Sequence, residues 1–125
     1  MRAPSARPRY LNLARISYPV GAIASIGHRI SGVLLVCTLP FAVLALQRSL
    51  ADAAAFVSLA GTLHSPVGRT GLLILAWVCA HHLFAGIRHL LMDVGVCASL
   101  PASRSSAVAV LGAGAAIAAA VAVLA

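Results

Sequence analysis

Ionisable residues gather at one end of an apolar stretch that begins at Gly71. The group consists of His81, His82, Arg88, His89 and Asp93. At about 3.6 residues per turn, one helical face would carry four residues of this region, namely His82, Gly86, His89 and Asp93. Ionisable groups inside a membrane segment are costly and by default indicate a functional site.

His82 is the member of this group with the clearest chemistry. It lies twelve residues beyond Thr70, about 18 Å along a helix. A buried imidazole needs a partner, because an unsatisfied polar group in lipid costs several kcal/mol. A helix carbonyl, a proton path or haem iron could each be that partner. Ala85 and Gly86 would leave room for a flat macrocycle, whereas His81 points about 100° away and is expected to pack or to support the site.

A second polar cluster, Ser25-Ile-Gly-His-Arg29, interrupts an earlier apolar segment. Ser25 and Arg29 are four residues apart and share a helical face, with His28 one turn from Ser25. A serine hydroxyl and an arginine fork can bind a carbonyl or carboxylate oxygen. Alternatively, Arg29 could extend to lipid phosphates. A composite site requires the two clusters to face each other.

Composition determines the class of protein that positions these clusters. The chain has 125 residues, of which 62% are hydrophobic and 9% charged, whereas soluble domains carry about a quarter charged residues. Its charge of +7 comes without a dense basic patch interleaved with aromatics, which argues against nucleic-acid binding. The three cysteines form no CxxC pair, so neither a disulfide framework nor a zinc site is expected.

The hydropathy pattern predicts an all-α integral membrane protein with three transmembrane helices. A basic arm at residues 1–18 precedes a three-helix anchor at 19–125, with spans at about 21–46, 70–91 and 107–125. Pro40 is expected to bend the first span. Residues 51–60 could form a short interfacial helix in the first loop. The last span is predicted to be a packing helix, since small residues recur every four positions.

Arginine positions predict the orientation. Seven lie on one side of the membrane: Arg2, Arg7, Arg9, Arg15, Arg29, Arg88 and Arg104. Only Arg48 and Arg69 lie on the other side. The positive-inside rule then places the N-terminus inside and the C-terminus outside. Both polar clusters would lie toward the inner face.

Taken together, these residues resemble a known family, the cytochrome b large membrane-anchor subunit of succinate dehydrogenase. The similarity rests on Arg7-Pro8, PVGAIASIGHRISGV at 19–33 and HLFAGIRHLLMD at 82–93. The family patterns S-x-x-H-R-[IV]-[ST]-G and H-x-x-x-G-x-R-H-x-x-x-D are both present in order. Two positions depart from the family, since Gly27 often has a bulkier apolar counterpart and His81 commonly an aromatic or apolar one.

The resemblance implies a subunit of succinate:quinone oxidoreductase (complex II), not catalytic on its own, in electron transport and the tricarboxylic acid cycle. The implied partners are a flavoprotein, an iron–sulfur protein, a second small membrane anchor and the lipid bilayer. One haem b would be shared with the second anchor, and His82 would be the axial ligand to its iron. His28, Arg29 and His89 would lie near the haem.

The resemblance also implies a ubiquinone-reduction site. Its residues would be Ser25, Arg29 and Asp93, receiving electrons from the iron–sulfur subunit. The expected location is a bacterial inner membrane rather than a mitochondrial one. Two alternatives remain open at this point. One is a haem-free structural anchor, and the other is a proton-linked transporter subunit with a relay of His82, His89 and Asp93.

Overall fold

The computed structural model describes residues 16–124, and within them all regular structure is helical. The four helices are α1 (Val20–Ser49), α2 (Ala53–His64), α3 (Pro66–Asp93) and α4 (Leu100–Leu124). Three of them, α1, α3 and α4, are long and apolar enough to cross a membrane. The predicted fold class is therefore confirmed. Four arginines of the predicted basic arm lie outside the described residues: Arg2, Arg7, Arg9 and Arg15.

Each long helix extends beyond the span expected from hydropathy. The largest extension is in α4, which begins at Leu100 rather than near residue 107. Pro101 is compatible with a first helical turn, because its missing N–H would have no partner there. Ser105 and Ser106 also donate their hydroxyls to carbonyls one turn earlier, those of Ala102 and Ser103 (both 3.1 Å), which lets polar residues continue the helix.

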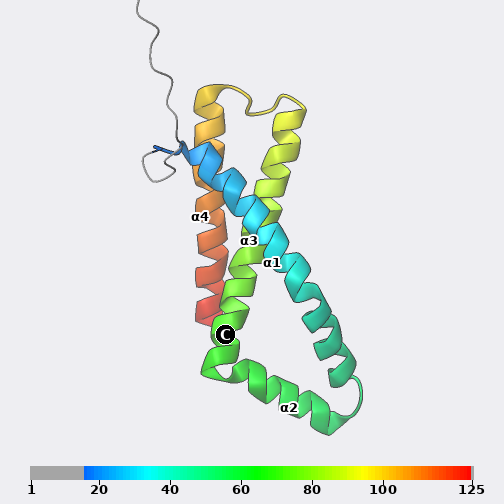
Figure 1. The fold of residues 1–125 in the computed structure, drawn as a ribbon. Helices are drawn as coiled ribbons and strands as arrows, with labels where there is room; N and C mark the ends of the chain where they lie inside the picture. Colours follow the sequence, from blue (N-terminus) through cyan, green and yellow to red (C-terminus); the bar gives the residue numbers. More distant parts are fainter. Residues whose placement is uncertain (1–15, 125) are drawn as a thin grey trace, which may run out of the picture.

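The first loop and the first helix contain two further features anticipated from the sequence. A short helix does form between the first two spans, as α2, and Asp52 caps it by accepting a hydrogen bond from the backbone N–H of Ala55 (2.7 Å). Pro40 lies inside an unbroken α1. Figure 1 shows α1 changing direction in its second half, as expected for a proline inside a helix.

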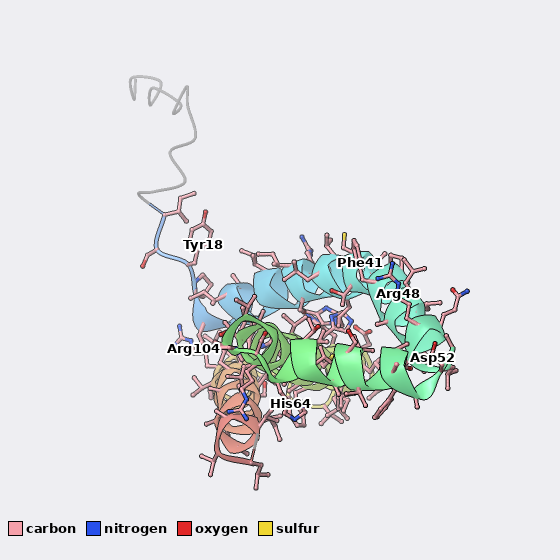
Figure 2. The ribbon with its side chains drawn as sticks, turned by 90° about the horizontal axis from the view of Figure 1, so that it is seen from below. Tyr18, Phe41, Arg48, Asp52, His64 and Arg104 are labelled. Carbon is pink, nitrogen blue, oxygen red and sulfur yellow. The ribbon has the colours of Figure 1, made fainter. Side chains whose placement is uncertain are left out.

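The helices form an antiparallel hairpin crossed by a third. Helices α3 and α4 run side by side, and α1 crosses them diagonally and contacts both (Figure 1). The turn between α3 and α4 contains two residues with positive φ, Gly95 (84°) and Cys97 (60°). Helix α2 joins the far ends of α1 and α3. Arg48 and Asp52 lie close together where α1 turns into α2, away from Tyr18 and Arg104 (Figure 2).

Mostly small side chains fill the interior. The buried apolar residues are Ala24, Val78, Ala80, Ala85, Ala107 and Val110. Large apolar side chains lie instead on the outside along every helix, Val36 (72% exposed) and Phe41 (70%) among them. Small interior residues let helices approach closely, and an apolar exterior suits contact with lipid or with other membrane helices.

Three polar residues are buried with this small core: Ser31, His81 and Arg88. Arg88 connects α3 to the first turns of α4. Its Nε donates to Ser106 Oγ (3.0 Å), and its Nη2 donates to the carbonyl and hydroxyl oxygens of Ser103 (3.1 and 3.0 Å). These contacts fix the hairpin near the turn, and the guanidinium remains hydrogen-bonded although only 6% of the residue is exposed.

We predict that Arg88→Met destabilises the hairpin. Methionine keeps an apolar stem in the same place but removes every hydrogen bond to α4, and bonds made by a charged group contribute about 1.5–3 kcal/mol. Thermal unfolding of the detergent-solubilised protein, followed by circular dichroism, should show a lower midpoint. Arg104→Met is the matched control, because Arg104 is exposed. Equal midpoints for the two variants would contradict a stabilising role for Arg88.

Candidate functional site

Helices α1 and α3 lie close together at positions where glycines face imidazoles. A Cβ atom added to Gly32 of α1 would lie 3.0 Å from His82 Cε1 of α3. A Cβ added to Gly86 of α3 would lie 3.3 Å from His28 Nε2 of α1. A side chain at either position would require the opposing histidine to shift. This arrangement brings the two polar clusters of the sequence together.

The ring of His82 is oriented by hydrogen bonds to α1. Its Nδ1 lies 3.1 Å from the carbonyl oxygen of His28 and 3.1 Å from Ser31 Oγ. Ser31 donates its own hydroxyl to the same carbonyl (2.8 Å), so its oxygen is available as an acceptor. Because a carbonyl can only accept, these contacts assign the proton to Nδ1 of His82.

This tautomer leaves Nε2 of His82 with a free lone pair. Nε2 has no hydrogen-bond partner among residues 16–124, and this atom is not fully buried. Metal-ligating histidines commonly have this arrangement, with one ring N–H held by a carbonyl and the other nitrogen free to bind. The residues present therefore fit an axial ligand to haem iron.

Three histidines form the centre of the site. The rings of His28 and His82 are stacked, with centroids 4.2 Å apart and planes 13° apart. The ring of His89, two turns beyond His82, lies 5.2 Å from that of His28 at 49°. Within the described part of the chain, no group of three His, Cys, Asp or Glu side chains could hold a metal ion. The site thus offers a single oriented ligand rather than a chelating set.

The other predicted site residues surround this centre less closely. Ser25 is half-buried on α1, and Arg29 is exposed beside Ile30. Asp93 is exposed at the last position of α3. No hydrogen bond joins these three to the histidines among the residues described. Helix α1 begins and α3 ends at the same end of the bundle (Figure 1).

Two features of the site were not anticipated from the sequence. Ser31, which contacts His82, was not singled out, although a serine three residues after His28 in an apolar helix could have indicated it. Of the two small residues expected beside a cofactor, Ala85 is 1% exposed and belongs to the interior, whereas Gly86 faces His28. His81 is also 1% exposed and packs in the interior.

Comparisons with known proteins agree with this architecture. Residues 3–123 match the family model described as succinate dehydrogenase/fumarate reductase transmembrane subunit. A relative from Coxiella burnetii (strain RSA 493 / Nine Mile phase I), named succinate dehydrogenase cytochrome b556 subunit, is 42% identical over 102 residues. That alignment covers 81% of this chain and 82% of the relative. The chain therefore belongs to the succinate dehydrogenase/fumarate reductase transmembrane subunits, among the cytochrome b membrane anchors of succinate dehydrogenase.

Proposed function

We propose that this anchor supplies one axial ligand, His82, to a single haem b shared with the second anchor subunit of complex II. The observation that carries the proposal is the hydrogen-bonded Nδ1 of His82, which leaves Nε2 free to bind. The relative's name, cytochrome b556, supports the same cofactor. When bound, haem b supplies a one-electron acceptor and donor within the membrane. The partner anchor would supply the other ligand.

His28 and His89 would help to hold the haem. His28 stacks on His82, and His89 lies beside His28, so both rings are close to any macrocycle bound at Nε2. Together with Arg29 they could donate hydrogen bonds to its propionate carboxylates. The chain's own residues would thus orient the cofactor and compensate its charge.

We predict that His82→Ala removes the b-type absorption of the purified complex or shifts its redox potential, because one of two axial ligands is lost. A reduced-minus-oxidised spectrum together with a redox titration measures this effect. His64→Ala is the matched control, since His64 ends α2, is exposed and bonds through Nδ1 to the Ala60 carbonyl (2.8 Å) of its own helix. An unchanged spectrum and potential in the His82 variant would disprove the ligand assignment.

We further propose that Ser25, Arg29 and Asp93 form this chain's part of a ubiquinone-reduction site. Succinate dehydrogenation on the flavoprotein would send electrons through the iron–sulfur subunit to quinone at the inner interface. Reduction places negative charge on the quinone oxygens, to which Ser25 can donate and which Arg29 can stabilise. Protons must follow, and Asp93 is accessible for that role because it is exposed. His89 provides a second possible relay.

We predict that Ser25→Ala slows quinone reduction roughly ten- to hundredfold, because a lost hydrogen bond to a buried or charged oxygen costs about 1–3 kcal/mol. Succinate reduction of an artificial acceptor that bypasses the membrane site should be unchanged. Arg29→Lys should retain only part of the quinone-reduction activity, since an ammonium does not reproduce the guanidinium fork.

The matched control is Ser49→Ala, at the opposite end of α1, where the hydroxyl bonds only to the Leu46 carbonyl (2.7 Å). This variant should keep both activities. Equal losses in the two assays for Ser25→Ala would indicate defective assembly instead of a damaged quinone site, and the assignment of Ser25 would be abandoned.

The proposed setting is a bacterial inner membrane, in a complex with the flavoprotein, the iron–sulfur subunit and the second anchor. The apolar exterior of α1, α3 and α4 supports contact with lipid and with another membrane subunit. The helix ends that carry Arg29 and Asp93 would face the cytoplasm, where the iron–sulfur subunit would deliver electrons. This orientation follows from the excess of arginine on that side.

We predict that the C-terminus lies on the outer side of the membrane, because three spans separate it from a cytoplasmic N-terminus. Of two reporters fused after the last residue, the one that functions outside the cytoplasm should be active and the one that functions inside should not. Paired fusions of alkaline phosphatase and green fluorescent protein measure the location. The same pair placed in the α1–α2 turn serves as the control, since that turn is expected on the outer side as well. Fluorescence without phosphatase activity at the C-terminus would reverse the orientation.

A further inference from the structure

His81 occupies the point where three helices meet. The ring stacks on Trp77 of the same helix, with centroids 5.4 Å apart and planes 12° apart. On the α4 side, a Cβ atom added to Gly114 would lie 3.4 Å from His81 Cβ. On the α1 side, a Cβ added to Gly27 would lie 2.6 Å from His81 Nε2. The imidazole is thus enclosed by Trp77 and by the backbones of both neighbouring helices.

The space at Gly27 depends on this enclosure. A carbon 2.6 Å from a ring nitrogen is inside van der Waals contact, so any side chain at position 27 requires a neighbour to move. His81 has little room to do so, because it is 1% exposed and held by Trp77 and Gly114. A larger residue at position 27 would therefore displace α1 itself.

Displacement of α1 would act on the ligand. Gly27 immediately precedes His28 and lies one turn before Ser31. The His28 carbonyl oxygen and Ser31 Oγ are each 3.1 Å from His82 Nδ1. A shift of about 1 Å would stretch both contacts beyond hydrogen-bonding distance. The space between Gly27 and His81 consequently determines whether α1 can reach the ring of His82.

We propose that Gly27 and His81 are a matched pair of positioning residues, which set the separation of α1 and α3 and through it the orientation of His82. This inference rests on the proposed role of His82 as a haem ligand. Neither residue touches the bound group in this proposal. His81 contributes volume that only a glycine on α1 can accept, and the histidine next in sequence receives its hydrogen bonds as a result.

The test exchanges the sizes of the two residues in the assembled complex. The variants are G27L, H81A and the double variant G27L/H81A, in which the leucine side chain occupies the space that the imidazole leaves. The control is G71L, because a Cβ at Gly71 meets no atom within 4 Å in the described part of the chain. The measurements are haem b content per flavin, the haem redox potential and the temperature at which haem is released.

We expect G27L to lose haem content severalfold or to shift the redox potential, while G71L leaves both unchanged. H81A should keep the spectrum and potential, because glycine still permits the contacts of His28 and Ser31, but it should release haem at a lower temperature, since it leaves a cavity. The double variant should recover most of the haem content and potential lost in G27L. Wild-type content and potential in G27L, or no recovery in the double variant, would overturn the pairing.

The outcome for the pair is separable from that for the proposed ligand. If His82→Ala changes neither the haem spectrum nor the redox potential, the ligand assignment fails, whatever the size exchange gives. If the spectrum or the potential depends on His82 but G27L behaves as G71L does, the ligand assignment stands and the positioning pair is wrong. Thermal unfolding of the protein moiety gives a readout that needs no haem, and there the double variant should be more stable than G27L.

Discussion

The packing of α1 against α3 follows from one constraint: the polar ring of His82 lies among apolar helices and is stabilised there by a partner within the protein. His82 satisfies it through α1, where the His28 carbonyl and Ser31 hydroxyl accept from one ring nitrogen. Those contacts require the two helices to lie very close together. Gly32 and Gly86 allow this proximity, since each faces an imidazole of the opposite helix. The small interior residues allow close packing along the rest of the bundle. The buried ring nitrogens of His81, by contrast, have no hydrogen-bond partner among residues 16–124.

Much of this architecture could be predicted from the sequence, because it depends on periodicity along single helices. The three spans follow from hydropathy, and the rotation of about 100° per residue places His81 and His82 on different faces. That rotation explains why one of two adjacent histidines enters the core and the other faces His28. The sequence predicts that the two polar clusters meet, but it does not predict where along α3 helix α1 crosses.

Features that depend on distances between helices could not be predicted in the same way. The bonds from Arg88 to Ser103 and Ser106 require the turn at 94–99 to fold α4 back at one particular register. Gly27 considered alone is a small residue in an apolar helix, and the sequence does not indicate what it faces. Its neighbour becomes evident only in the folded chain, where a Cβ atom at position 27 would lie 2.6 Å from His81 Nε2.

The chain order of these helices has a consequence for biogenesis. His28 leaves the ribosome 54 residues before His82, so α1 enters the membrane before its main partner exists. Ser31 does not need that partner, because its hydroxyl donates to the His28 carbonyl within the same helix (2.8 Å). Helices α3 and α4 follow each other in the chain and are joined by a short turn, so they can pair as soon as both have been synthesised. The Ser31 hydroxyl is therefore already paired when α1 enters the lipid, and the contacts with His82 form only after α3 has been synthesised.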